Sequence, residues 1–144
     1  MAIFNKYRNS SGSIIVEAAL IIPILLGITF FIIEFGNILY ISNSLNQIAR
    51  SVARIASVTS SYTNQQLITE SGATSLLKDI SKFSLTISPA SGMSRAVGAQ
   101  ISVTAQYNYT PIINPFKLLN SNQSWSPVLR SIAISRSEVS NVSQ

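Results

Sequence analysis

Hydrophobic residues are concentrated in one long run near the start of the chain. Residues 1–12 are polar and basic, residues 13–33 are almost wholly apolar, and Glu34 closes the run. No charged residue occurs from Ala18 to Ile33, and with Ile14–Val16 added the stretch reaches the roughly 20 residues that a helix needs to cross a bilayer. The pattern therefore predicts a membrane-spanning helix.

The charges on either side of this span predict its orientation. Lys6 and Arg8 precede it, so the positive-inside rule places the N-terminus in the cytoplasm and the rest of the chain outside. Arg50 and Arg54 lie farther beyond the span and are a weaker signal of the opposite sign. The sequence after Glu34 has no small-residue motif of the kind that ends a signal peptide, so we expect the apolar segment to be retained.

The apolar pattern continues beyond the span with the period of a helix. Six aliphatic residues recur at alternating spacings of three and four, as in an a/d seam: Ile38, Ile41, Leu45, Ile48, Val52 and Ile55. We therefore expect one helix to run through residues 13–57. The seam packs either on a sheet of the same chain, which we favour because amphipathic helices usually face their own core, or on neighbouring subunits of a filament.

The remaining residues, 58–144, are predicted to form a small α+β head. Gln65–Ser81 has apolar residues at helical spacing, and Gly72 is the point at which this helix would split. Apolar and polar residues then alternate in 84–88 and again in 97–109, with a Pro- and Gly-containing turn between them. This pattern predicts an antiparallel hairpin with one buried and one wet face.

Three further segments complete the predicted head. Pro111–Pro127 is irregular, and we expect its large apolar side chains to cap the core rather than form an exposed contact loop: Phe116, Leu118, Leu119 and Trp125. Residues 128–137 form a final strand with Ile132 and Ile134 on one face, and the polar tail Glu138–Gln144 is expected to fray. The fold class is thus α+β, a long membrane-spanning and then amphipathic helix packed on a small antiparallel sheet.

The composition supports a chain made of a membrane-spanning helix and a small head, and it argues against catalysis. Hydrophobic residues make up 47% of the 144 residues and charged residues only 10%, against the ~25% charge of ordinary globular chains. There is no Cys and no His, which excludes thiol chemistry, disulfides, Cys/His zinc sites and the commonest general base. Ser75–Lys78 matches S-x-x-K, but the partner motifs S-D-N and K-T-G are absent. We expect no enzyme activity, no cofactor and no metal.

Basic residues do not indicate a nucleic-acid site. The net charge is +5, but the ten Lys and Arg residues are spread along the chain instead of forming a stripe or run. We therefore expect no nucleic-acid partner.

A short motif lies at the boundary between the basic leader and the apolar run. Gly12 is followed by Ser13, and Glu17 stands within the apolar segment. A carboxylate inside a membrane helix costs about 2.5–3.5 kcal/mol and needs a compensating partner. A cut after Gly12 would create a cationic amine on Ser13, one helical turn from Glu17 of the same chain and available to Glu17 of a neighbour. The sequence alone leaves both pairings open.

Basic leader, Gly12, Glu17 and an immediate apolar span resemble the class III leader of type IV pilins and pseudopilins. The resemblance extends through Glu34-Phe35-Gly36, Tyr40, Leu45–Arg50 and Ala53-Arg54, which are similar to the TadE-like family, the pseudopilins of tight-adherence (Flp) pilus systems. It covers roughly the first 55 residues well.

This resemblance implies a structural protein with defined partners. Prepilin peptidase would cut between Gly12 and Ser13, and Glu17 and Glu34 would serve assembly with other pilin or pseudopilin subunits and the pilus assembly platform. Residues 1–12 would be a cytoplasmic leader, 13–57 the transmembrane and assembly helix in the lipid of the bacterial inner membrane, and 58–144 the extracytoplasmic head. The chain would initiate, assemble or anchor a surface pilus. The alternative is an unprocessed, signal-anchored bitopic protein whose head binds a partner.

Overall fold

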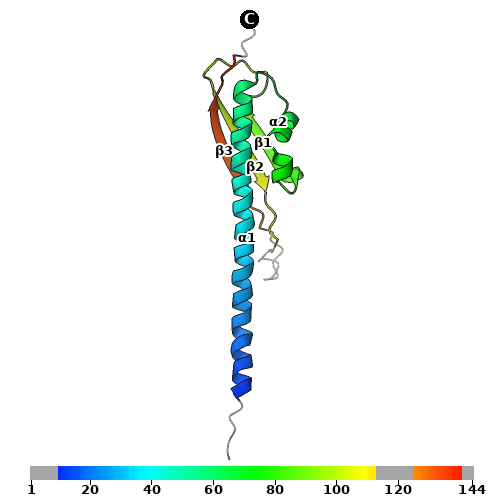
Figure 1. Ribbon diagram of the computed structural model, residues 1–144, viewed down its shortest axis with the longest axis vertical. Helices are drawn as coiled ribbons and strands as arrows, with labels where there is room; N and C mark the ends of the chain where they lie inside the picture. The colour runs from blue at the N-terminus through cyan, green and yellow to red at the C-terminus, as the bar shows by residue number, and fades with distance from the viewer. Residues whose placement is uncertain (1–9, 113–124, 141–144) are drawn as a thin grey trace, which may run out of the picture.

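A single long helix carries a small head along its C-terminal part (Figure 1). The computed structural model describes residues 10–112 and 125–140. Helix α1 spans Ser10–Val58, or 49 residues, which corresponds to a length of about 74 Å. The head contains α2 (Asn64–Glu70), α3 (Ala73–Leu76), the 3-10 turn η1 (Ile80–Lys82), β1 (Phe83–Ser88), β2 (Gln100–Asn108) and β3 (Val128–Arg136). The predicted α+β fold class is confirmed.

Helix α1 is continuous through Pro23 and Gly27. Proline removes one backbone donor from a helix and glycine lowers its stability, yet both are tolerated in membrane helices. α1 is also long and apolar enough to cross a membrane, and its most apolar stretch is not buried in the described part of the chain.

The three strands form an antiparallel sheet in the order β1-β2-β3. Leu85 pairs with Ala105 and Ala105 with Ser131, so β2 is the central strand and the predicted hairpin of β1 and β2 is confirmed. β2 begins at Gln100 rather than at residue 97, because a turn closed by Gly98 (φ 85°) precedes it. The expectation that Val97 joins the strand is wrong, and its side chain is 66% exposed.

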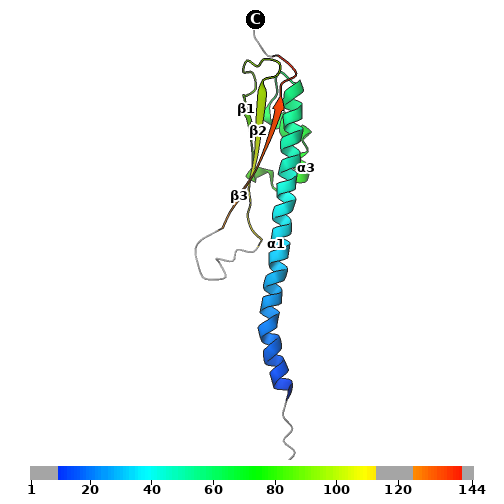
Figure 2. The same ribbon diagram turned by 90° about the vertical axis from the view of Figure 1, so that its left-hand side faces the viewer.

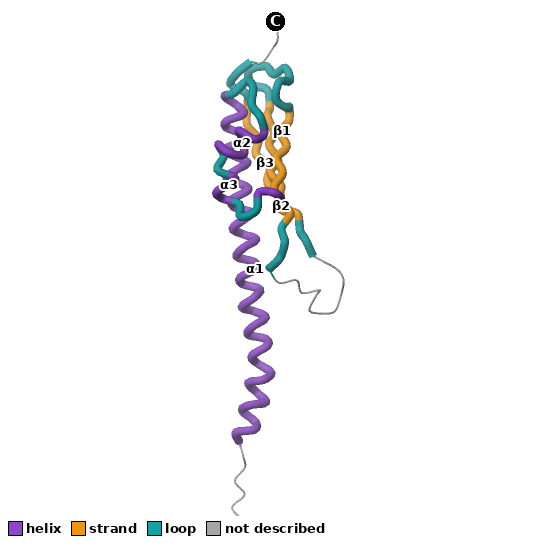
Figure 3. The backbone as a smooth tube through the Cα atoms, turned by 90° about the vertical axis from the view of Figure 1, so that its right-hand side faces the viewer, coloured by secondary structure: helices purple, strands orange, loops and turns teal. Residues whose placement is uncertain are grey.

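The helix expected over Gln65–Ser81 is broken into α2, α3 and η1. Gly72 adopts φ 73°, a left-handed conformation that L-residues avoid and that ends the first piece. α2 begins with a capping box in which the Thr63 side chain accepts from the backbone N–H of Gln66 and the Gln66 side chain accepts from that of Thr63. Figure 3 shows α2 and α3 beside the upper part of α1.

The core lies between the C-terminal part of α1 and the sheet, as Figure 2 shows. Leu45, Ile48 and Val52 of the seam are fully buried in one cluster with Ile101 and Val103 of β2. The remaining seam residues are partly buried against that cluster: Ile38, Ile41 and Ile55. Buried alanines of α1 flank the seam and allow the helix to approach the strands closely: Ala49, Ala53 and Ala56. The seam thus packs on the sheet of its own chain.

Strand β3 turns Leu129, Ser131 and Ala133 toward the core and its two isoleucines away from it. Ile132 and Ile134 share one face, but that face is the solvent side, where they are 54% and 65% exposed. Ser131 lies buried beneath α1, and its hydroxyl donates to Asn46 Oδ1 at 2.6 Å. The small side chain of Ser131 thus lies where α1 approaches β3 closely, while Leu129 packs against the core at the lower end of the strand.

The ends of the head differ from expectation in two places. Trp125 is exposed, so it does not cap the core as predicted, and Phe116, Leu118 and Leu119 lie outside the described residues. The tail does not fray from its first residue, because the Glu138 N–H donates to the Ser57 carbonyl at 2.8 Å.

Arg95 caps the C-terminal end of α1, and this charged residue is almost fully buried, with only 1% of its surface exposed. Its guanidinium donates to the carbonyls of Ala56 (3.1 Å), Thr59 (2.9 Å) and Ser60 (3.3 Å). The same group lies 5.6 Å from the centre of the Tyr62 ring. The carbonyls at a helix C-terminus lack intrahelical donors and carry partial negative charge, which compensates the buried cation.

Replacing Arg95 with Met should destabilise the head by about 2–3 kcal/mol, because buried carbonyls lose charged donors. Arg54→Met removes a cation from the exposed face of α1 and should change stability by less than about 0.5 kcal/mol. Urea unfolding of the full chain in detergent micelles, followed by hydrogen exchange of β2 amides, measures both. Equal effects of the two variants would contradict the capping role.

Candidate functional site

The apolar first half of α1 has no partner within the described chain. All 14 large apolar residues from Ile14 to Ile33 are exposed, from 45% at Phe30 to 69% at Phe31. A contiguous apolar surface of this size marks a membrane or subunit contact. α1 is therefore divided into an uncovered apolar part and a part sealed by the head.

The predicted cleavage and assembly residues lie along this uncovered part. Gly12 and Ser13 are exposed in the first turns of α1, and nothing lies within 4 Å of a Cβ placed on Gly12. Glu17 is exposed one turn later, and no other described side chain or backbone group hydrogen-bonds to its carboxylate. Glu34 lies 17 residues beyond Glu17, or about 25 Å along the helix axis, so the structure does not bring these two carboxylates together.

Glu34 instead connects the helix to the lower end of the sheet. Its Oε1 accepts from the Tyr109 hydroxyl at 2.6 Å, and its Oε2 accepts from the Ile112 N–H at 3.2 Å. We refer to these two bonds as the Glu34 lock. Sequence reasoning missed it, although Tyr109 ends the buried face of the predicted strand and Glu34 is the first carboxylate beyond the span.

The Glu34 lock also alters the acidity of Tyr109. Burial of the ring, and then the hydrogen bond to the Glu34 carboxylate, raise the pKa of the Tyr109 phenol above its usual value of 10.0. Both causes favour the neutral phenol, which is the form that can donate.

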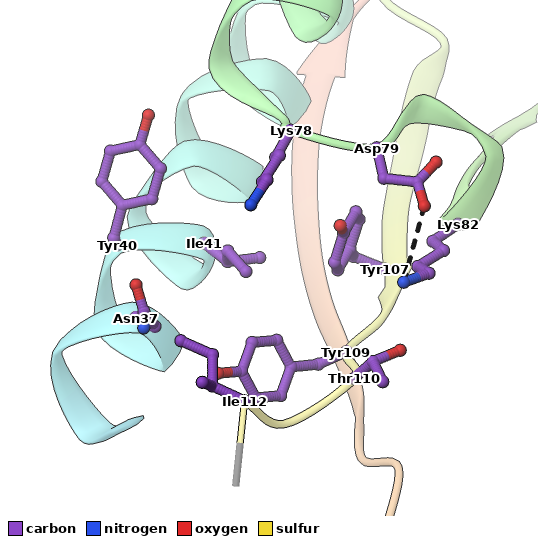
Figure 4. A pocket seen from close by; sticks show the side chains of 10 residues that line it. All are labelled: Asn37, Tyr40, Ile41, Lys78, Asp79, Lys82, Tyr107, Tyr109, Thr110 and Ile112. Atoms are coloured by element: carbon purple, nitrogen blue, oxygen red, sulfur yellow. Dashed lines mark ion pairs between the residues drawn. The ribbon is translucent and has the colours of Figure 1, made fainter. Parts of the chain in front are cut away.

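A cavity of about 520 Å³ opens directly above this lock (Figure 4). α1 contributes Asn37, Tyr40 and Ile41 to its wall, and the end of β2 contributes Tyr107 and the chain that follows. Because these elements are far apart in sequence, no local motif signals the cavity.

The third wall of the cavity carries charge. Lys82 Nζ lies 3.5 Å from Asp79 Oδ2, and the Ser81 hydroxyl and N–H donate to the other carboxylate oxygen and lower the pKa of Asp79. Lys78 has no ion-pair partner among the described residues. Figure 4 shows its ammonium directed into the space between α1 and β2.

The arrangement offers binding surfaces rather than reactive groups. The described residues contain no group of three or more acidic residues placed to hold a metal. The hydroxyl of Ser75, from the S-x-x-K match, donates to the Gly72 carbonyl at 2.8 Å within the turn that starts α3.

These features define an α+β protein with a long N-terminal helix whose apolar first half is uncovered among the described residues. A family model described as TadE-like protein matches residues 12–54, a segment that contains Gly12, Glu17 and Glu34. The resemblance seen in the sequence is thereby confirmed for that segment. For that segment the match suggests a protein associated with Tad pili and their subunits, and the family is not known as enzymatic. No curated protein and no solved structure matches the chain.

Replacing Tyr109 with Phe should lower head stability by about 1 kcal/mol near pH 7, because a partly buried donor to a carboxylate is lost. The native phenol has a raised pKa, so its stabilising contribution is complete below pH 10 and is lost as the pH rises above 10. The difference between wild type and Tyr109→Phe should therefore shrink in alkaline solution. Urea titrations from pH 7 to 11 measure it, and a difference that grows with pH would contradict the lock.

Proposed function

We propose that the chain is the precursor of a minor pseudopilin that is processed after Gly12 and helps to initiate, assemble or anchor a Tad/Flp-type pilus. The observation that supports this most directly is the division of α1. Its TadE-like segment begins with an apolar surface that the head leaves uncovered, whereas one face of residues 45–56 is buried against the sheet. A subunit that moves from membrane to filament needs such a surface, because lipid and neighbouring helices cover it in turn.

The same apolar surface of α1 can contact lipid before assembly and neighbouring helices after it, for a simple physical reason. Helices in lipid gain little hydrophobic energy by associating, so close packing and polar contacts decide which neighbours they choose. The exposed side chains of Leu25 and Phe31 are available for such packing, and nothing lies within 4 Å of a Cβ placed on Gly27. The helix can therefore exchange lipid for protein without unfolding the head.

Glu17 supplies the polar contact in this proposal. It is exposed on α1 and has no hydrogen-bond donor among the described residues. Cleavage after Gly12 would create the Ser13 amine, and the amine of one subunit would neutralise Glu17 of the next. Removing the ~2.5–3.5 kcal/mol cost of a lone carboxylate in lipid would then favour one helix register over all others.

In the membrane, the chain is proposed to be single-pass, with its N-terminus in the cytoplasm and its head outside. Lys6 and Arg8 support this orientation through the positive-inside rule. The single spanning-length helix of the described chain is consistent with it.

Processing can be tested by intact mass and N-terminal sequencing of the membrane-extracted protein, made with and without its prepilin peptidase. We expect a chain that begins at Ser13 only when the peptidase is present. Gly12→Val should block the cut, whereas Gly36→Val, at another glycine of α1 with open space around it, should leave cleavage intact. A chain that keeps residues 1–12 beside the cognate peptidase would favour the signal-anchored alternative.

The assembly role of Glu17 predicts a separation of insertion from polymerisation. Glu17→Ala should insert normally, since it removes a charge from the span, but its incorporation into filaments should fall at least tenfold, as expected for ~1.4 kcal/mol or more per contact. Glu70→Ala, at the exposed end of α2, is the matched control. Carbonate-resistant membrane fraction and subunit content of sheared filaments give the two readouts. Normal filaments with Glu17→Ala would overturn this role.

A further inference from the structure

We infer that the cavity above the Glu34 lock is a binding site for the phosphate headgroup of an anionic membrane phospholipid. This inference rests on the membrane placement proposed above. It concerns a different part of the chain from the cleavage and assembly residues.

The height of the cavity on α1 is the first argument. The apolar run ends at Glu34, and the cavity residues Asn37 and Ile41 follow it by three and seven positions, about 5–11 Å farther along the helix axis. The headgroup layer of a bilayer extends about 5–7 Å beyond the hydrocarbon on each side. The cavity thus begins where lipid phosphates lie, and the Glu34 lock fixes the sheet at that level.

Charge is the second argument. The charged residues that line the cavity are Lys78, Lys82 and Asp79, which leaves one surplus positive charge in the wall. The Glu34 carboxylate lies below the cavity and is taken up by the Tyr109 hydroxyl and the Ile112 N–H. Asp79 is occupied by Lys82 and Ser81, which leaves the Lys78 ammonium as the charged donor directed into the space. A lysine binds phosphate as a point charge, and basic residues near a membrane surface attract anionic lipids.

The walls also suit the rest of a lipid headgroup. Tyr107 and Tyr40 bring aromatic rings to the cavity from opposite elements, and tyrosines favour the polar boundary of a membrane. Asn37 adds an amide that can donate to phosphate or glycerol oxygens. Below the cavity, Phe30 and Gly27 continue the same face of α1 as Asn37 and Glu34 at helical spacing, so acyl chains can run down that face.

The test uses the full chain in nanodiscs that contain phosphatidylglycerol and phosphatidylcholine in equal amounts. Native mass spectrometry then measures how much phosphatidylglycerol remains bound after release from the disc. Lys78→Met should reduce the bound fraction roughly fivefold, as expected for the ~1 kcal/mol that one basic residue contributes near an anionic surface. Lys78→Arg should retain it, because the charge is kept.

Arg130→Met is the matched control for position. Arg130 pairs with Gln106, next to Tyr107 of the cavity, so it lies at a similar height, but it is exposed on the outer face of β3. We expect it to leave lipid retention unchanged. Equal losses from Lys78→Met and Arg130→Met would show general surface attraction and overturn the site.

Two further outcomes separate the possible explanations. If 10 mM inorganic phosphate displaced the lipid from wild type as completely as excess phosphatidylglycerol, the cavity would be a free-phosphate site and the lipid assignment would be wrong. Carbonate extraction in parallel tests the membrane placement itself, which Lys78→Met should not change. If carbonate extracted the wild-type protein from the membrane, the proposed function would be wrong. If the protein stayed inserted and Lys78→Met retained as much phosphatidylglycerol as wild type, only this inference would be wrong.

Discussion

The close contact between one face of α1 and the sheet is the constraint on which the rest of the molecule depends. Leu45, Ile48 and Val52 fill the space above β2, and flanking alanines let the helix backbone approach the strands. The head covers α1 only along this contact, which ends near Glu34. The remaining apolar turns of α1 are uncovered in the described chain, and the proposed contacts with lipid and other subunits rest on that limit.

Periodic patterns predicted most of the fold because they reflect burial directly. The long apolar run, the seam of α1 and the alternation in β1 and β2 each report one repeated environment, and the structure places them accordingly. Periodic patterns were less informative where a single residue decides the local backbone conformation. Gly72 and Gly98 adopt positive φ and break a helix and a strand that periodicity alone would continue. On β3, alternation identified the shared face of Ile132 and Ile134, but it did not show that this face points to solvent.

The candidate functional features divide in the same way. The Gly12, Ser13 and Glu17 motif is local, so it can be read from the sequence, and the family match begins at its first residue. The cavity and the Glu34 lock could not be predicted, because Glu34 and Tyr109 are 75 residues apart and meet only once the sheet docks. The capping role of Arg95 could not be predicted for the same reason. A lone arginine in a polar turn resembles a surface residue until the end of α1 is placed beside it.

The head is attached to α1 at both ends of their contact, and this has a mechanical consequence. The Glu34 lock holds the lower end, while Arg95 and the Glu138 N–H hold the upper end near Ser57, 23 residues or about 35 Å away along the axis. Tension applied along α1 therefore loads the intervening side-chain contacts in shear, so many of them must fail together rather than one after another. The helix and its head would bear an axial load as a single rigid strut.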